Sequence, residues 1–294
     1  MTTASWTVAR NARRWLSVIL LVASSWGGVA QAEPQLVTNG DIEYSIDAVP
    51  SWVSRTTVQE SPPGIASAAA PIRNLLLDFQ LSLLGSAPQL YIHQVRAAQT
   101  FGAVDKIANV IIAFSPDSER LTVHALSLLR GGQRMDKLPT VRVELLRGET
   151  EREAPFYDAV VTAAFLLDDV RVGDIVEAEY TLSTETSVER ELYNSTFPLA
   201  TAEPVDTLKV RVLSVTGRPL RYSVLFADVT PRVTRHEDVT ELTLERTAVP
   251  AITQEEPSKP EDALLWPHLR VIEYVIWSAG TRASSCTGRG RKSS

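Results

Sequence analysis

The sequence predicts a mainly β protein in which antiparallel sheets pack as a β-sandwich. Short stretches that alternate apolar and polar residues recur between residues 110 and 245, and Gly, Pro, Asp and Asn separate them. No stretch keeps a helical period, and no segment repeats. A period of two residues is typical of a strand with one buried face, and many such strands at short spacing favour a sandwich.

The strands can be placed in order along the chain. The apolar stretch 71–84 fits a helix or a strand, and its alternation at Asp78-Phe79-Gln80-Leu81 favours a strand. Within 121–128 the apolar phase slips after Ala125, which predicts a β-bulge. Arg130-Gly131-Gly132-Gln133 has the composition of a hairpin turn. Further strands are expected at 110–114, 141–145, 160–167, 176–182, 208–212, 222–226 and 242–244, with a last one inside 264–277.

Strand 176–182 has the most regular alternation. Every second residue is apolar, and Glu177, Glu179 and Thr181 stand between them. We therefore expect this strand to be half-buried, with its apolar residues in the core and its polar residues in solvent.

The first 32 residues have the pattern of an export signal. Arg10, Arg13 and Arg14 precede an apolar stretch at 15–23, and Ala30-Gln31-Ala32 offers small residues for cleavage after Ala32. The apolar stretch is short for a hydrocarbon core of about 30 Å, so a cleaved signal is favoured over a permanent anchor. General secretion is favoured over the twin-arginine route, because only part of that motif is present. We expect a periplasmic or secreted protein without a stable membrane span after cleavage.

The charge balance argues against two classes of partner. The chain has 29 basic and 35 acidic residues, a net charge of −6, and the predicted signal would remove three arginines and no acid. Nucleic acids and anionic membrane surfaces are bound by Lys and Arg that neutralise phosphates. An acidic chain therefore indicates that nucleic acid is not a partner.

The segment 278–294 differs from the rest of the chain. It has four basic residues, no acidic residue and no large apolar side chain, so it is expected to be disordered. Polyanion binding is one possible role, and a broken reading frame near codon 278 is the explanation that we favour. The sole cysteine, Cys286, lies here without a following histidine, so we do not expect a thiol nucleophile.

These observations divide the chain into five segments. They are a signal peptide (1–32), an N-terminal segment with an exposed linker (33–71), a β-sandwich module (72–250), a proline-rich linker with a closing strand (251–277) and the tail (278–294).

Several stretches share a pattern of turns and strand starts with a known family. They are Trp52-Val53, Leu75-Leu76-Leu77-Asp78-Phe79-Gln80, Phe114-Ser115-Pro116-Asp117-Ser118-Glu119-Arg120-Leu121-Thr122-Val123-His124, Leu129-Arg130-Gly131-Gly132, Phe156-Tyr157-Asp158 and Leu166-Leu167-Asp168-Asp169-Val170-Arg171-Val172-Gly173-Asp174-Ile175-Val176-Glu177. Together they resemble the extracytoplasmic module called domain of unknown function 3857, over about residues 52–277. The resemblance implies a bacterial secreted or periplasmic protein of mostly β fold. It also implies a following transglutaminase-like domain with a Cys-His-Asp triad, before which we expect this chain to be truncated.

Candidate chemistry is confined to one histidine and three acids. Asp168, Asp169 and Asp174 precede strand 176–182, and paired carboxylates can divide acid and base roles, here with His124. The same acids also suit turns, where Asp side chains bond to nearby backbone, and His124 suits a polar strand position. We favour the turn role and assign no catalytic, cofactor-binding or metal-binding residue. None of the four histidines has the spacing of a metal site.

Three functions follow from these residues. The favoured one is an exported, non-catalytic β module that packs on a transglutaminase-like domain or presents substrate to it; this chain would not be an enzyme by itself. It predicts an exposed apolar patch near 264–277. The second is a module that binds cell-wall peptide or glycan, with Tyr157, Tyr193 or Trp266 as a stacking platform. The third is a hydrolase that uses the Asp and His residues above.

Overall fold

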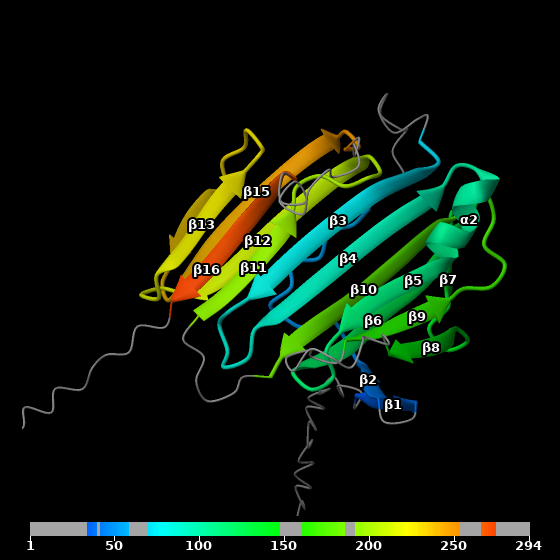
Figure 1. Ribbon diagram of the computed structural model, residues 1–294, viewed down its shortest axis with the longest axis horizontal. Coiled ribbons are helices and arrows are strands. Elements are labelled where there is room, and N and C mark those ends of the chain that lie inside the picture. Colours follow the sequence, from blue (N-terminus) through cyan, green and yellow to red (C-terminus); the bar gives the residue numbers. More distant parts are fainter. Residues whose placement is uncertain are drawn as a thin grey trace, which may run out of the picture. The chain divides into compact units, whose positions relative to one another are not determined.

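Three β-sheets make up the described part of the chain in the computed structural model (Figure 1). The structure describes residues 34–39, 42–58, 70–147, 160–185, 192–252 and 266–274. The predicted signal, the tail with Cys286, most of the proline-rich linker and Tyr157 lie outside these residues. The prediction of a mainly β fold is confirmed.

The largest sheet has ten strands. They are β1 (Gln35–Asn39), β2 (Ile42–Ile46), β3 (Ile72–Ser82), β4 (Gln89–Ala98), β6 (Glu119–Arg130), β7 (Gln133–Asp136), β10 (Ile175–Thr184), β12 (Val205–Val215), β14 (Arg232–His236) and β15 (Val239–Val249). Their order is β1-β2-β6-β10-β4-β3-β12-β15-β14, and β7 pairs with β6 outside this path. Most neighbours are antiparallel, as predicted, but β2 pairs with β6 and β3 pairs with β12 in parallel.

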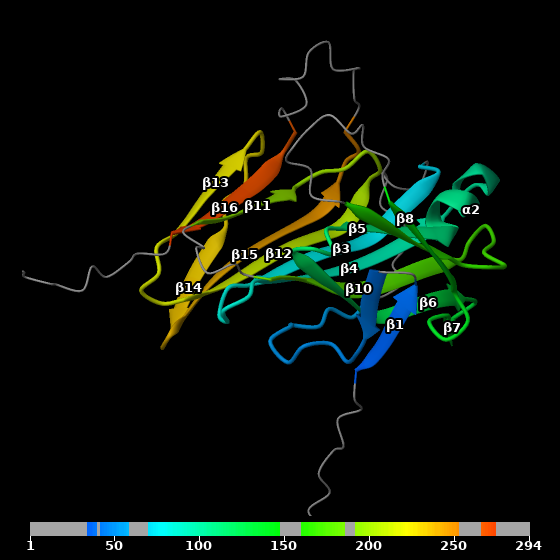
Figure 2. The same cartoon turned by 60° about the horizontal axis from the view of Figure 1, so that its bottom comes forward.

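Two sheets of three strands cover one face of the large sheet (Figure 2). One has the order β11 (Leu192–Pro198), β16 (His268–Tyr274), β13 (Leu220–Leu225), and the other β5 (Asn109–Phe114), β9 (Val161–Leu166), β8 (Arg142–Arg147). Two apolar clusters fill the space between the layers. One joins β6 and β10 to β5 and β9, and the other joins β3, β12 and β15 to β11 and β16. This is the face-to-face packing expected of a sandwich.

A helix that the sequence pattern does not predict lies between β4 and β5. Helix α2 (Phe101–Ala108) has eight residues and buries Ala103 and Ile107. Two turns are too short to establish a visible helical period, which explains why the pattern missed it. Within the described residues, no helix has the length and apolar character needed to cross a membrane.

Strand β10 corrects the prediction of a half-buried strand. Its apolar residues lie in the core cluster as expected, but Glu177 and Glu179 are each only 7% exposed and Thr181 is 2% exposed. The alternation identifies the face that meets the small sheets. It cannot show that β10 is a central strand, or that its other face lines a cavity together with a distant segment, residues 55–58.

The predicted bulge is present in β6 and is centred on His124. Glu179 and Tyr180 of β10 pair with Ala125 and Val123, which leaves His124 without a partner in the register. The extra residue lets apolar side chains on both sides of the bulge reach the same core cluster.

The predicted hairpin turn joins β6 to β7. Arg130 pairs with Gln133, and the two glycines between them have φ of 56° and 77°. Positive φ at both central residues is the requirement of a type I′ turn, which glycine meets without steric strain.

The turn gives a direct test of backbone strain. Gly132→Ala should lower the free energy of unfolding by about 1–2 kcal/mol, because an L side chain at positive φ approaches the following carbonyl. Urea denaturation measures the loss. Gly102→Ala in α2 is the matched control, because an added Cβ meets no atom within 4 Å at either glycine. The control should be neutral or stabilising by up to about 1 kcal/mol; an equal loss in both variants would contradict the assignment of strain.

Candidate functional site

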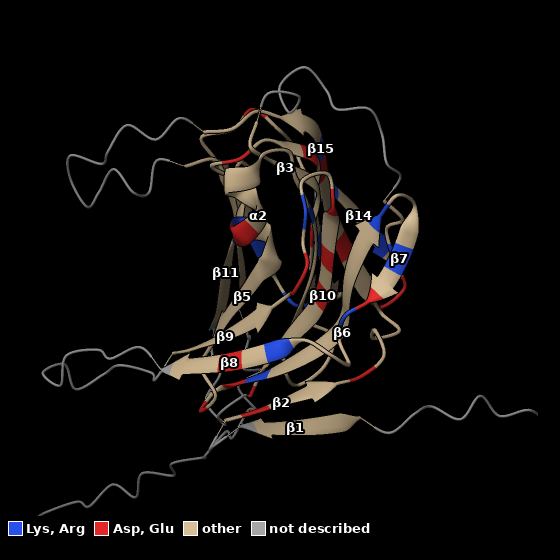
Figure 3. Cartoon of the chain, turned by 90° about the vertical axis from the view of Figure 1, so that its right-hand side faces the viewer, with Lys and Arg blue, Asp and Glu red and all other residues tan. Residues whose placement is uncertain are grey.

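A row of polar side chains crosses the face of the large sheet that the small sheets leave uncovered. The register places Glu245, Lys209, Asp78, His93 and Glu179 beside one another on β15, β12, β3, β4 and β10. We call these five residues the polar row. Figure 3 marks acidic and basic positions on the strands of this sheet. Lys209, Asp78 and Glu179 each stand between two apolar residues of their strands, and opposite charges on neighbouring strands stabilise their pairing.

The row becomes more deeply buried towards the centre of the sheet. Lys209 and Glu245 form an ion pair of 3.7 Å near the edge, with side chains 30% and 59% exposed. Asp78 is only 2% exposed, and burial raises the pKa of its carboxyl despite hydrogen bonds from Gln80 and Thr56. The central members therefore sit where charge is costly unless it is compensated.

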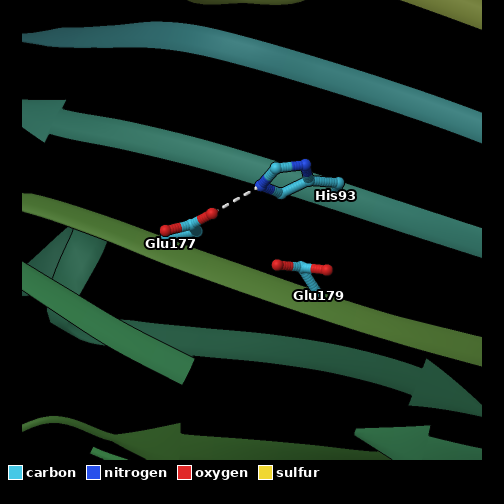
Figure 4. Close-up of side chains that lie close together, drawn as sticks. All are labelled: His93, Glu177 and Glu179. Atoms are coloured by element: carbon cyan, nitrogen blue, oxygen red, sulfur yellow. Dashed lines mark hydrogen bonds and ion pairs between the residues drawn. The ribbon is translucent and has the colours of Figure 1, made fainter. Parts of the chain in front are cut away.

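His93, Glu177 and Glu179 converge at the centre of the sheet (Figure 4). We call them the buried cluster. His93 donates from Nε2 to Glu177 Oε1 over 2.8 Å. One ligand atom from each of the three side chains lies within 4.8 Å of the others. Glu177 and Glu179 are two residues apart on β10, so they project from the same face of the strand.

Two side chains hold the carboxylates from outside the buried cluster. Tyr91 donates its hydroxyl to Glu179 Oε2 over 2.8 Å, and Arg134 on β7 pairs with Glu177 Oε2. Burial raises the pKa of the Tyr91 phenol, and the Glu179 charge raises it further, so the phenol remains a donor. Burial favours a higher pKa for Glu177, but His93 and Arg134 outweigh that effect and lower it. Glu177 is thus an ionised carboxylate.

A cavity of about 380 Å³ lies against the buried cluster. Residues Arg55, Thr56, Thr57 and Val58 line its opposite side, and Arg134 lines it together with the three cluster residues. Such a volume accommodates a small ligand. Among the described residues, Arg55 makes no hydrogen bond or ion pair, so the cavity has a cation available to a ligand.

Hydrogen bonds from the sheet hold the segment that contains Arg55. Gln80 accepts from the Ser54 amide (2.9 Å) and donates to its carbonyl (2.7 Å), and Thr56 donates to Asp78 (3.1 Å). Residues 53–58 of the predicted linker are exposed or half-buried, and these hydrogen bonds hold them against the polar face. The remainder of that linker up to residue 69 lies outside the described residues.

The acids singled out from the sequence lie in a turn before β10. Arg130 binds Asp174 through two nitrogens, at 2.8 and 2.7 Å, and binds Asp169 at 3.0 Å. Asp174 also accepts from the backbone N–H of Arg171 over 2.7 Å, and Asp169 has φ of 58°. Asp168 is exposed and makes no hydrogen bond or ion pair with a described residue. These contacts are those of a turn fixed by an arginine.

His124 belongs to a different hydrogen-bond network from these three acids. It donates from Nδ1 to the Asp47 carbonyl (2.9 Å), and its Nε2 lies 2.7 Å from Thr181 Oγ1. Burial lowers the pKa of this histidine although the Asp47 carbonyl opposes the shift. A neutral ring then accepts from the Thr181 hydroxyl, which gives His124 a structural role in the bulge.

Sequence reasoning missed the buried cluster and its partners. His93 stands alone in its stretch, and Glu177 and Glu179 look like the solvent side of a half-buried strand. Their proximity depends on the pairing of β4 with β10, across more than eighty residues of chain. The only local signal is the place of Glu177 and Glu179 on the polar side of an alternating strand.

Comparison with known proteins identifies a family and a shared fold. Residues 88–253 match the family described as a domain of unknown function with a solved structure, DUF3857. No curated protein matches the sequence. The fold is similar to that of a candidate protease from Parabacteroides distasonis, with a TM-score of 0.60 and 17% identity, over 70% of this chain and 40% of that one. An M1 zinc metallopeptidase from Deinococcus radiodurans has a TM-score of 0.36 and 15% identity over 71% of this chain and 43% of its own, too low a score to argue from. The chain thus spans about two fifths of the length of each.

The contacts of Asp174 predict a specific pH dependence. Burial alone raises the pKa of this carboxyl, but the hydrogen bonds from Arg130 and Arg171 outweigh burial and hold the pKa below its usual value. The stabilisation is therefore present above the unfolded pKa of about 3.9 and is lost as pH falls through the lower folded value. Asp174→Asn should be less stable than the wild type at pH 7, and the difference should shrink below about pH 4.

Urea denaturation between pH 7 and pH 2.5 measures this difference. Asp168→Asn is the control, because a change at an exposed side chain without contacts usually alters stability by less than about 0.5 kcal/mol. A difference for Asp174→Asn that persists unchanged at the lowest pH would show that the ion pair is not its source.

Proposed function

The chain belongs to the family of domain of unknown function 3857, and on this basis we propose that it is an exported, non-catalytic binding module. In this proposal the cavity beside the buried cluster holds a cell-wall peptide and presents it to a separate transglutaminase-like domain. Export rests on the signal pattern in residues 1–32, and the catalytic partner rests on the family resemblance.

The observation that carries the proposal is the pairing of the polar groups in the cavity. Nucleophilic catalysis needs a base in contact with a hydroxyl or thiol. Among the described residues, His93 hydrogen-bonds to Glu177 and to no hydroxyl or thiol. The Tyr91 hydroxyl is held by Glu179, and burial makes it harder to ionise. A charged cavity without an activated side-chain nucleophile favours binding over covalent catalysis.

The charges of the cavity favour a peptide over a glycan. Arg55 places at the cavity a guanidinium group without an ion pair among the described residues, and guanidinium groups bind carboxylates through paired hydrogen bonds. Glycan binding usually needs exposed aromatic faces. Of the three proposed stacking residues, Tyr193 packs against the second core cluster, Tyr157 lies outside the described residues, and Trp266 is half-buried and lines a different cavity. We therefore favour a peptide that presents a carboxylate.

Two exposed aromatic side chains beside the closing strand support a partner domain. Tyr222 on β13 and Phe226 just after it are 42% and 54% exposed. Tyr222 pairs with Val271 of β16, and the Phe226 ring lies 6.2 Å from that of His268. This is the region in which the favoured function predicts a docking surface. The Parabacteroides distasonis protein, of which the match covers 40%, has length for such a domain.

A binding experiment tests the proposal. Isothermal titration of the full chain with soluble peptides released from bacterial cell wall should show binding. Arg55→Gln should weaken it at least about tenfold, since losing a charged hydrogen bond costs about 1.5–3 kcal/mol. Arg232→Gln is the matched control, because Arg232 is also exposed but lines a different cavity.

Turnover of the same peptides separates the alternatives. Binding without any cleavage or transfer by the chain alone agrees with an accessory module. Cleavage that is lost in His124→Gln or His93→Gln would instead establish the hydrolase alternative. Equal peptide binding by the Arg55 and Arg232 variants would show that this cavity is not the peptide-binding site.

A further inference from the structure

Glu179 is a buried carboxylate without a cation in contact with it. It is 7% exposed, and its one hydrogen bond among the described residues comes from the neutral Tyr91 hydroxyl to Oε2. Arg134 neutralises Glu177 and makes no ion pair with Glu179. An ionised carboxylate in such a place is costly unless a positive charge compensates it. The second oxygen, Oε1, remains available on the side of the cavity that Glu179 lines.

The surrounding ligand atoms complete a coordination set. His93 supplies an imidazole nitrogen, and Glu177 and Glu179 supply one carboxylate oxygen each, all within 4.8 Å of one another. His93 Nε2 and Glu177 Oε1 are now joined by a hydrogen bond of 2.8 Å. A metal ion replaces the proton in such a contact, because both ligands bind metals in their deprotonated forms.

We propose that His93, Glu177 and Glu179 bind one divalent transition-metal ion of the zinc class. Three protein ligands around zinc leave a fourth position, here on the cavity side, for water or for a ligand carboxylate. Calcium and magnesium are disfavoured, because calcium takes six to eight oxygen ligands and magnesium keeps mostly waters, whereas an imidazole nitrogen suits zinc.

The outer contacts of the buried cluster match those of a metal site. In both carboxylates one oxygen is held from outside, by Tyr91 on Glu179 and by Arg134 on Glu177, while the other oxygen is left for the ion. Such outer hydrogen bonds orient ligands and typically change metal affinity by 10–100-fold. Tyr91 and Arg134 are thus positioning residues, and a bound cation would supply the charge that Glu179 lacks.

Zinc binding by the full chain tests the proposal. After removal of metals with a chelator and dialysis, isothermal titration with Zn²⁺ should show one ion per chain. Zinc X-ray absorption should show only nitrogen and oxygen neighbours at about 2.0–2.2 Å. A sulfur neighbour at about 2.3 Å would place the ion on Cys286 and overturn the proposal.

Variants locate the ion. Glu179→Gln and His93→Gln should each weaken zinc binding at least 100-fold, and Tyr91→Phe should weaken it about 10–100-fold, because it removes only an orienting hydrogen bond. The Tyr91 variant keeps the ring and all three ligands, so it carries the test if a ligand variant fails to fold. His236→Gln is the matched control, because this histidine is exposed on β14, and it should bind as the wild type does. Equal affinity in the Tyr91, His93 and His236 variants, or no stoichiometric binding by the wild type, would overturn the proposal.

This inference rests on the buried cluster and not on the proposed peptide ligand. The zinc titration contains no peptide, and the Arg55 experiment can be run with chelator present. Failure of either one therefore leaves the result of the other interpretable.

Discussion

The constraint that organises the candidate site is the burial of carboxylates at the centre of the large sheet. Removing an ion from water costs several kcal/mol even after the protein relaxes. Glu177 and Glu179 share one face of β10, so they need compensation from neighbouring strands. His93 on β4 and Arg134 on β7 compensate Glu177, whereas Glu179 receives only the neutral hydroxyl of Tyr91 on β4.

The layers of the fold give the two faces of the large sheet different roles. The two small sheets close one face over apolar clusters, which provides the packing energy. Residues 53–58 contact the other face through hydrogen bonds to Gln80 and Asp78, and a cavity remains beside them. The buried cluster is therefore shielded from bulk water but lines a cavity that can hold a small molecule, which is the arrangement that a binding site requires.

Local features of the fold could be predicted from the sequence, and the candidate site could not. The alternating strands, the bulge at His124 and the glycine turn after Arg130 are encoded within a few residues, so pattern and turn chemistry predict them. Burial of Glu179 depends on which strands become its neighbours, and the contact of His93 with Glu177 depends on long-range register. The sequence pattern places Asp174 in a turn, but it cannot identify its partner Arg130, because the two residues are 44 positions apart in the chain.

The central claim is that Tyr91 and the buried cluster serve binding and are not needed to hold the sheet. The free energy of unfolding of a variant in which apolar residues replace all four side chains tests this claim. The variant combines Tyr91→Phe, His93→Leu, Glu177→Met and Glu179→Met, and urea denaturation gives its free energy of unfolding. Replacing a buried ionic group by apolar residues of similar volume is often neutral or stabilising by about 1–4 kcal/mol, and our account predicts such a result. A loss of several kcal/mol would contradict it and would show that the buried network is structural.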